Sequence, residues 1–251
     1  MLHHPTLEKL QQLRLAGMSK ALAEQAAQPQ VAELGFEERL GLLADRELTE
    51  RENRRLTTRL RQARLKHNAC VEDIDYRAPR GLDKALIAQL AACRWIHEGL
   101  NLILVGPTGV GKTWIACALA HKAARAGYKV QYLRLPRLLE ELHLAHGDGR
   151  FPKLMASLAK TDLIVLDDWG LAQLDAGQRR DLLELLDDRH GQRSTIVTSQ
   201  LPVEHWHEVI GDHTLADAIL DRIVHSAYRI TLKGESMRKR HATLTVPILS
   251  E

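Results

Sequence analysis

One short segment sets the architecture of this chain: Gly106-Pro107-Thr108-Gly109-Val110-Gly111-Lys112-Thr113, which matches every fixed position of the phosphate-binding loop pattern G-x-x-x-x-G-K-[ST]. The apolar run 102–105 precedes this segment, and the helix-forming run 114–120 follows it. A strand, a loop and a helix in this order form the context in which the pattern binds phosphate. The segment therefore predicts a nucleotide site at the end of a buried strand.

The residue types in this loop have defined roles in holding a nucleotide. Its glycines allow backbone conformations that a Cβ would forbid, so successive amides can point at an anion. The helix that follows directs the positive end of its dipole at the phosphates. Lys112 supplies a mobile cation for the outer phosphates, and the Thr113 hydroxyl is placed to join the coordination shell of Mg²⁺.

A second motif bears on whether the nucleotide is hydrolysed. Residues 163–166 are apolar and are followed directly by Asp167 and Asp168. The carboxyl ends of parallel strands border the crevice where ligands of such sheets bind. We expect Asp167 to orient Mg²⁺ through its water shell and Asp168 to polarise the attacking water.

The asparagine positions favour ATP over GTP. Many phosphate-loop GTPases select guanine with an Asn-Lys-x-Asp signature downstream of the loop, but the asparagines of this chain are Asn53, Asn68 and Asn101. The strand expected at 195–199 would end beside the γ-phosphate if it neighbours the Asp167 strand. Either Ser199 or Gln200 could then contact the phosphate or the attacking water, and the sequence leaves this choice open.

Apolar periodicity divides the chain into a helical part and an α/β part. Residues 5–66 have helical spacing, which we expect Gly17, Pro29 and Gly35 to break into separate helices. A linker around 68–81 marks the boundary between a helical domain, 1–70, and a nucleotide-binding domain, 71–251. A helix from Asp83 to His97 then precedes five short strands. These strands are expected at 102–105, 129–134, 162–167, 195–199 and 228–232. Their alternation with helices predicts a parallel sheet with helices on its faces.

Basic residues gather upstream of the nucleotide-binding part. The formal net charge is +3, and all of the excess lies in residues 1–70. A cluster of cations there faces the single acid Glu52: Arg51, Arg54, Arg55, Arg59, Arg61, Arg64 and Lys66. This segment fits contact with the phosphates of DNA, and a solvated helix face is the alternative. Residues 37–75 lack the aromatic side chains that stack on single-stranded bases, so duplex DNA is the expected partner.

Cysteine usage and hydropathy bear on the compartment. The cysteines are Cys70, Cys93 and Cys117, a widely spaced and odd set that fits neither a disulfide framework nor a zinc site. The amino terminus lacks the pattern of a signal peptide, and no apolar run approaches the length of a membrane span. We expect a cytoplasmic protein without a membrane partner.

Taken together, these motifs resemble AAA+ ATPases of the IstB/DnaC type, most closely the IstB branch, the helper ATPases of insertion-sequence transposition. The similarity extends over nearly the whole chain and includes residues 15–18, 93–96, 106–113, 132–134, 136–139, 166–170, 198–202, 216–222 and 233–238. It implies an AAA+ domain that binds ATP and Mg²⁺. It also implies self-assembly on DNA with nucleotide at the subunit interfaces, and a transposase as partner.

The resemblance also implies roles for individual residues. Lys112 and Thr113 correspond to the Walker A pair, Asp167 and Asp168 to Walker B, Ser199 to sensor 1, Arg222 to an arginine finger acting on the neighbouring subunit, and Arg238 to sensor 2. An ion pair with Asp221 is the structural alternative for Arg222, and a solvated tail is that for Arg238. The chain departs from many AAA+ proteins in carrying Asp168 where they have Glu, and hydrolysis is therefore expected to be slow and DNA-stimulated. The chain also ends within about twenty residues of its last expected strand, so no helical lid domain is expected.

The leading hypothesis is an ATP-dependent DNA-binding regulator that assembles on target DNA, presents it to a transposase and is switched off by hydrolysis. One alternative is a loader of the replicative helicase. Another is an ATP-gated DNA-binding scaffold with little turnover, which the shorter Asp168 motivates. A small-molecule kinase is least favoured, because it gives no role to the arginine-bearing helix at 215–224 or to the basic segment.

Overall fold

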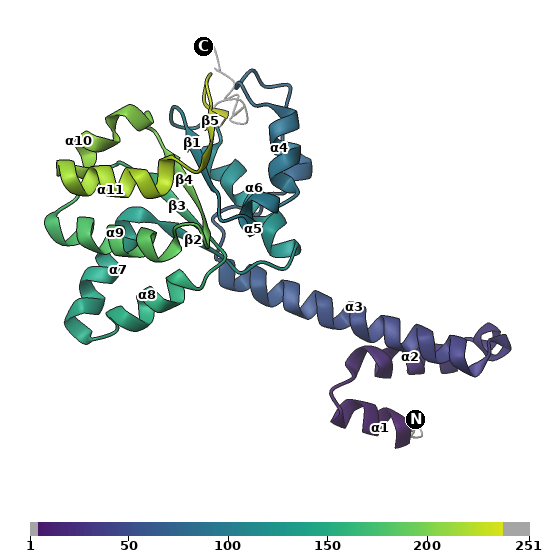
Figure 1. The fold of residues 1–251 in the computed structure, drawn as a ribbon. Coiled ribbons are helices and arrows are strands. Elements are labelled where there is room, and N and C mark those ends of the chain that lie inside the picture. Colours follow the sequence, from purple (N-terminus) through teal and green to yellow (C-terminus); the bar gives the residue numbers. More distant parts are fainter. Residues whose placement is uncertain (1–4, 238–251) are drawn as a thin grey trace, which may run out of the picture. The chain divides into compact units, whose positions relative to one another are not determined.

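The computed structural model describes residues 5–237, and the chain divides into two compact units, residues 1–59 and 60–251 (Figure 1). The sequence predicts that residues 60–70 belong to the amino-terminal domain, but they pack with the second unit. Ala63 and Ala69 are fully buried there, and Ala63 belongs to the main core cluster. That residues 1–70 act as a separate functional domain stays a prediction. No helix among residues 5–237 has the length and apolar character needed to cross a membrane.

The first unit consists of helices α1 (Pro5–Gln12) and α2 (Ala16–Ala26), a 3₁₀ turn (Pro29–Glu33) and most of the long helix α3 (Phe36–Ala63). The predicted break between two helices is present, but it lies between Gln12 and Ala16, and Gly17 itself is the second residue of α2. It is buried inside α2, where a Cβ would lie 2.7 Å from the carbonyl oxygen of Arg46. The Gly17 amide also donates to the Glu47 carboxylate at 2.7 Å. This glycine therefore allows α2 to approach α3 closely.

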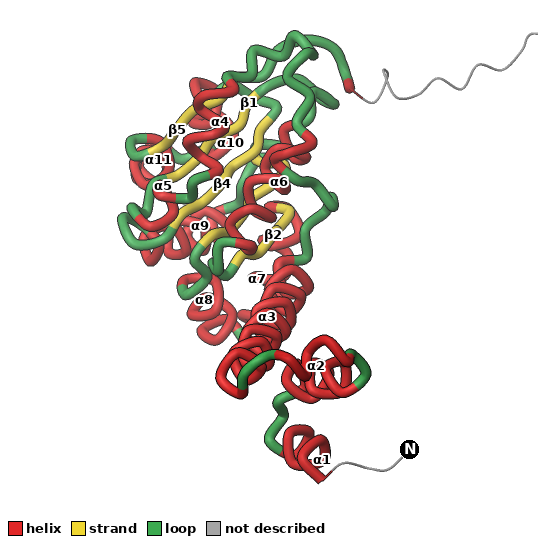
Figure 2. Tube along the Cα trace, turned by 90° about the vertical axis from the view of Figure 1, so that its right-hand side faces the viewer, coloured by secondary structure: helices red, strands yellow, loops and turns green. Residues whose placement is uncertain are grey.

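A five-stranded parallel sheet forms the centre of the second unit (Figure 2). The strand order is β2-β3-β4-β1-β5, and each strand is parallel to its neighbours. The strands are β1 (Asn101–Val105), β2 (Val130–Arg134), β3 (Leu163–Trp169), β4 (Ser194–Ser199) and β5 (Ala227–Thr231). All five lie where the apolar runs predicted them, and the α/β fold class is confirmed.

Helices cover both faces of this sheet (Figure 1). One face carries α4 (Lys84–Ala91), α5 (Arg94–His97) and α6 (Lys112–Arg125), and the other carries α7 (Leu135–Asp148), α8 (Phe151–Ala159), α9 (Ala176–Arg189), α10 (Trp206–Ile210) and α11 (His213–Val224). Along β1, Leu102 and Leu104 pack into the first of these layers, whereas Ile103 and Val105 pack into the second. Successive side chains of a strand point to opposite faces, so a strand covered on both sides is apolar throughout.

Two local details differ from the regular elements expected from sequence. The helix predicted from Asp83 to His97 is divided into α4 and α5, because Cys93 adopts the left-handed conformation with φ of 60°. In β3, the pairing with β4 shifts between Leu166 and Trp169, and Asp168 has φ of 65°. The shift is a β-bulge, a feature that redirects side chains next to active sites.

The strand order brings three strand ends together. Because β4 lies between β3 and β1, the carboxyl ends of these strands meet at one edge of the sheet. After β5 the chain turns back along the loop at 106–113, where the Met237 amide donates to the Gly109 carbonyl at 2.9 Å. No helical lid domain occurs within residues 5–237.

Candidate nucleotide-binding site

The loop between β1 and α6 has the backbone conformation of a phosphate cradle. Gly106, Gly109 and Gly111 have φ of 149°, 85° and 100°, values that side chains rarely allow. Helix α6 begins at Lys112, directly after the last of these glycines. The first amides of a helix have no carbonyl partner within it, so the amides that open α6 are available to an anion.

Arg80 supports this loop from behind, a role that the sequence did not suggest. Its guanidinium donates to the carbonyls of Val110 at 3.1 Å and Asp75 at 2.7 Å, and the residue is buried. A Cβ on Gly111 would lie 2.7 Å from Arg80 Nη1, so the glycine leaves room for this guanidinium and also allows the φ of the loop. Arg80 lies between Pro79 and Gly81 in a stretch with the composition of a simple linker, and no sequence signal marks it.

The side chain of Lys112 bends back onto the phosphate loop. Its ammonium donates to the carbonyls of Gly106 at 2.6 Å and Pro107 at 2.8 Å. Burial lowers the pKa of Lys112, and the carboxylates of Asp167 and Asp168 oppose that shift. A polyphosphate in the loop would add negative charge beside the ammonium and favour its charged form.

Asp167 is the most heavily engaged side chain of the site. It is fully buried and accepts hydrogen bonds from the hydroxyls of Thr113, at 2.7 Å, Thr198 and Tyr132. Lys66 Nζ lies 3.4 Å from its Oδ2. Burial raises the pKa of Asp167, but the hydrogen bonds and the Lys66 charge outweigh burial and hold the pKa below its ordinary value. The carboxylate is therefore charged at neutral pH.

The two acids of the second motif differ in their surroundings. Asp168 accepts a hydrogen bond from Arg134 Nε at 2.8 Å, and its side chain is 21% exposed, whereas Asp167 is fully buried. The β-bulge and the left-handed φ of Asp168 redirect its side chain from the position that a regular strand would give it. Asp168 is thus held by a cation at the end of β2, the neighbour of β3.

Three residues at the end of β4 have distinct contacts. Thr198 donates to Asp167, as described above. Ser199 is turned toward the backbone, donating to the Trp169 carbonyl at 2.9 Å and accepting from the Leu201 amide at 3.0 Å. Gln200 contacts the phosphate loop, because its amide oxygen accepts from the Thr108 hydroxyl at 2.7 Å. Of the two candidates left open by the sequence, Gln200 therefore lies on the loop.

Thr198, Tyr132 and Arg134 are site residues to which the sequence reasoning gave no role. Thr198 directly precedes the two residues that the sequence offers as candidates, and its position inside the strand does not distinguish it. Tyr132 and Arg134 are polar residues near the carboxyl end of a strand that is otherwise expected to be apolar. Polar side chains at such a position are the signal that could have identified them.

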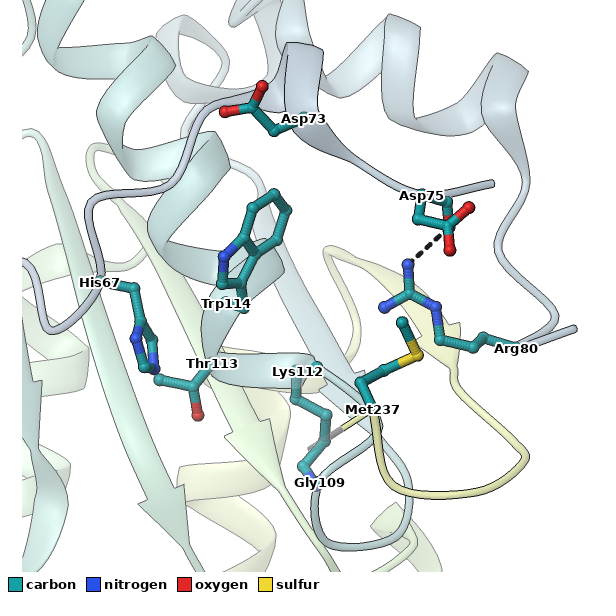
Figure 3. Close-up of a pocket in the computed structure, with 10 residues that line it drawn as sticks. His67, Asp73, Asp75, Arg80, Gly109, Lys112, Thr113, Trp114 and Met237 are labelled. Carbon is teal, nitrogen blue, oxygen red and sulfur yellow. Dashed lines mark hydrogen bonds between the residues drawn. The ribbon is translucent and has the colours of Figure 1, made fainter. Parts of the chain in front are cut away.

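A cavity of about 550 Å³ opens beside the loop. Figure 3 shows Lys112 and Gly109 at one end of it, His67 beside Thr113, and Asp73 at the other end beyond Trp114. This volume is within the range of pockets that bind small molecules. The residues fit ATP with Mg²⁺: the glycine loop and Lys112 suit phosphates, and the Thr113 hydroxyl and Asp167 carboxylate, 2.7 Å apart, are the hard oxygen donors that Mg²⁺ prefers.

The arginines expected to act in hydrolysis lie elsewhere. Arg222 is near the end of α11, where it pairs with Asp187 at 2.8 Å and with Asp221 at 2.6 Å. Its own carbonyl accepts from Asn101 at the start of β1, so Arg222 lies at the sheet edge opposite the phosphate loop. Arg238 lies outside the described residues, directly after Met237.

The basic segment is divided between the two units. Arg51, Arg54, Arg55, Arg61 and Arg64 are all exposed, and two of them form ion pairs: Arg51 with Glu47 at 2.7 Å and Arg54 with Glu50 at 3.5 Å. Arg59 is the last residue of the first unit. Lys66 reaches Asp167, so the structure places this candidate DNA contact in the nucleotide site.

Comparison with known proteins shows a family of ATP-binding proteins. The family model of IstB-like ATP binding proteins matches residues 8–245. An insertion sequence ATP-binding protein of Sinorhizobium fredii is 54% identical over 95% of this chain and 98% of its own length. The structure of DnaI superposes with a TM-score of 0.57 at 23% identity, over 66% of this chain and 91% of that one. The structure of the DnaC helicase loader superposes with a TM-score of 0.52 at 21% identity, over 59% of this chain and 87% of that one. These two share the fold of the second unit, a parallel sheet with helices on both faces. The chain belongs to the family of IstB-like ATP-binding proteins.

Proposed function

We propose that this chain is an ATP-dependent regulator of DNA transposition that assembles on duplex target DNA and delivers it to a transposase. One observation carries the ATP-dependent part: Thr113 and Thr198, from two different elements, donate their hydroxyls to the same buried carboxylate, Asp167, beside a glycine-rich loop. The insertion-sequence relative in Sinorhizobium fredii supports transposition as the process served. The free cysteines support a cytoplasmic location.

In the proposed ATPase, each residue of the site has one task. Thr113 and Asp167 would hold Mg²⁺, which neutralises negative charge on the outer phosphates in sites of this class. Lys112 turns from the loop carbonyls to the phosphates. Gln200 accepts a hydrogen bond from Thr108 of the loop and is therefore placed to contact the outer phosphate. Ser199, the preceding residue, is the alternative for this contact.

Asp168 is the residue that we assign to the attacking water. Its Oδ2 accepts from Arg134 Nε, which leaves Oδ1 open to water but holds the carboxylate toward the end of β2, so we expect it to turn from this ion pair to reach the attacking water. The pair therefore favours a resting state with slow hydrolysis. DNA binding would accelerate turnover if the assembled protein separates Arg134 from Asp168.

We further propose that Arg222 serves the nucleotide of a neighbouring subunit. Its backbone is bonded to Asn101 at the first residue of β1, whereas the phosphate loop follows the last residue of that strand. Five residues of extended strand separate the two ends by roughly 13 Å. Arg222 is thus remote from its own loop, which supports an oligomer with ATP at its interfaces and a finger supplied in trans. Arg238 would approach the nucleotide from its own subunit.

For duplex DNA, the exposed Arg55, Arg61 and Arg64 are the best-placed contacts of the basic segment. The ion pairs of Arg51 and Arg54 reduce the charge that these residues can offer to phosphate. Arg59 completes the proposed set. Lys66 is better explained by its contact with Asp167.

The proposed function is tested by measuring ATP hydrolysis with and without duplex DNA. We expect slow basal turnover that DNA stimulates, and retention of protein on DNA with a non-hydrolysable ATP analogue. Lys112→Ala should abolish both, because it removes the phosphate-binding cation. Asp168→Asn should hydrolyse poorly yet remain on DNA with ATP. Unchanged ATP affinity in Lys112→Ala would refute the site.

The Arg134–Asp168 pair also favours a second candidate, an ATP-gated DNA-binding scaffold with little turnover. Single-turnover hydrolysis on duplex DNA separates the two, because a scaffold would show no stimulation. The helicase-loader alternative gains no such support, since likeness at 21% identity concerns the fold alone. Pull-down of a replicative helicase in place of a transposase would nevertheless favour it.

A further inference from the structure

Asn101 occupies a junction between the sheet and helix α11. The residue begins β1, is only 6% exposed, and lies at the edge of the sheet opposite the phosphate loop. Its side-chain amide nitrogen donates to the carbonyls of Arg222, at 3.1 Å, and Ile223, at 3.3 Å. The last carbonyls of a helix have no partner within it, so Asn101 supplies donors that the end of α11 needs.

The remaining polar groups of Asn101 tie this helix end to two further strands. Its side-chain oxygen accepts from the Thr195 amide on β4 at 2.9 Å, and its backbone amide donates to the Ser226 carbonyl, just before β5, at 2.8 Å. One residue thus fixes the end of α11 to β1, β4 and the start of β5. The first residue of a strand needs only its backbone hydrogen bonds, whereas Asn101 also uses both polar atoms of its side chain.

The junction determines where Arg222 can be presented. Residues of a helix end move with their carbonyls, so a shift at the carbonyl of Arg222 moves its side chain too. Two of these strands, β1 and β4, lead to the nucleotide site: β1 ends at the phosphate loop, and β4 carries Thr198 and is followed by Gln200. Asn101 therefore lies between a subunit's own nucleotide site and the arginine that we assign to its neighbour's site.

We infer that Asn101 is a positioning residue for Arg222, holding the backbone at the end of α11 in the geometry at which the guanidinium meets the nucleotide of the adjacent subunit. Asp187 and Asp221 hold the guanidinium itself, and His190 Nδ1 lies 3.4 Å from the Arg222 carbonyl oxygen, so the guanidinium must also leave its two acids to act in trans. This inference rests on the proposed function, because it requires Arg222 to act in trans. A misplacement of about 1 Å can cost a factor of about 10² in rate, and an arginine finger contributes roughly 10³ to 10⁵. Removal of the Asn101 hydrogen bonds should therefore give a defect smaller than removal of Arg222.

The main variant is Asn101→Asp, which keeps the size and the oxygen that accepts from Thr195. It replaces the donor to α11 with an oxygen that repels the carbonyls of Arg222 and Ile223. We expect DNA-stimulated hydrolysis to fall by about 10- to 100-fold. ATP affinity should stay within about twofold, because the subunit's own site is intact. Asn101→Ser, with a shorter side chain, is the second variant in case Asn101→Asp fails to fold.

Ser194→Ala is the matched control. Ser194 is fully buried at the same edge of the sheet, but its hydroxyl donates to the Trp95 carbonyl at 3.3 Å, away from α11. This variant tests whether removing any buried hydrogen bond at that edge slows hydrolysis. We expect the control to remain within about twofold of the unmodified protein, since it leaves the transition-state interactions in place.

Subunit mixing distinguishes positioning of Arg222 from a general structural role. Asn101→Asp supplies an intact nucleotide site and a misplaced arginine, whereas Lys112→Ala supplies the reverse. We expect an equimolar mixture of these two variants to recover hydrolysis above either alone. A mixture of Asn101→Asp with Arg222→Ala should recover nothing. The double variant Asn101→Asp/Arg222→Ala should be no slower than Arg222→Ala, because both changes remove one function.

Four results would overturn the inference, and the two subunit mixtures distinguish its failure from that of the trans role of Arg222. If Arg222→Ala mixed with Lys112→Ala recovers activity but Asn101→Asp mixed with Lys112→Ala does not, Arg222 acts in trans and Asn101 does not position it. If neither mixture recovers activity, the trans role of Arg222 fails and the inference fails with it. Hydrolysis by Asn101→Asp at the unmodified rate would also overturn it, as would a defect in Ser194→Ala of the same size.

Discussion

Thr198→Val removes one hydrogen-bond donor from the buried Asp167 carboxylate with little change in side-chain volume. Thr198 is 1% exposed and Asp167 is fully buried, so water cannot easily replace the missing donor. A hydrogen bond to a charged group contributes roughly 1.5 to 3 kcal/mol. Asp167 retains the hydroxyls of Thr113 and Tyr132. We therefore expect the free energy of unfolding of the second unit to fall by about 2 kcal/mol.

Tryptophan emission during urea denaturation measures this change. The chain has 4 tryptophans, and all of them lie in residues 60–251, so their emission reports on the second unit: Trp95, Trp114, Trp169 and Trp206. A chelator keeps divalent metal ions from binding Asp167. Thr198→Ser is the control, because it keeps the hydroxyl and removes one methyl group, worth about 0.8 kcal/mol.

The effect of Thr198→Val should depend on pH in a defined direction. Burial raises the pKa of Asp167, but its hydrogen bonds, with that from Thr198 the largest, hold the pKa below its ordinary value. A lowered carboxylate pKa contributes stability that is present above the pKa of the unfolded chain and is lost as pH falls through the folded value. The penalty should thus be full at pH 7 and shrink below about pH 4. A penalty under about 0.5 kcal/mol at pH 7 would refute the reasoning, since surface changes have effects of that size.

Three other variants test separate parts of the structure. Gly17→Ala should loosen the packing of α2, because the added Cβ would lie 2.7 Å from the Arg46 carbonyl oxygen. We expect the opening free energy of α2, measured by amide hydrogen exchange, to fall by about 1–3 kcal/mol. Gly41→Ala, with open space around the added Cβ, should instead stabilise α3. Arg134→Met should free Asp168 from an ion pair worth about 1 kcal/mol, so we expect basal ATP hydrolysis to rise by roughly fivefold. A fall in rate would show that Arg134 assists the reaction. Changing Arg55 and Arg61 to Gln should reduce the slope of log affinity for duplex DNA against log salt concentration by about 0.9 for each phosphate that is no longer neutralised. Arg51→Gln should alter this slope less, because Arg51 is paired with Glu47. A slope equal to that of the unmodified protein would exclude the segment from the interface.

Local patterns in the chain are sufficient to predict its elements and the phosphate cradle. Apolar runs located all five strands, and the glycines with Lys112 and Thr113 identified the loop, because loop conformation and strand periodicity depend on residues adjacent in sequence. Pairing of the Asp167 motif with the loop also followed from the strand-end rule. The helix break predicted at Gly17 lies a few residues earlier, and the close approach of Gly17 to a helix turn some thirty residues away was missed.

Long-range packing decided which side chains meet at the site. Thr198 reaches Asp167 because β4 lies beside β3, and Arg134 reaches Asp168 because β2 lies on the other side. The β-bulge at Asp168 and the buried Arg80 behind the loop likewise depend on pairing between distant segments. Strand order and register cannot be predicted from composition and residue spacing. Those are set by the free energy of burying both sheet faces at once, and only the folded chain reveals them.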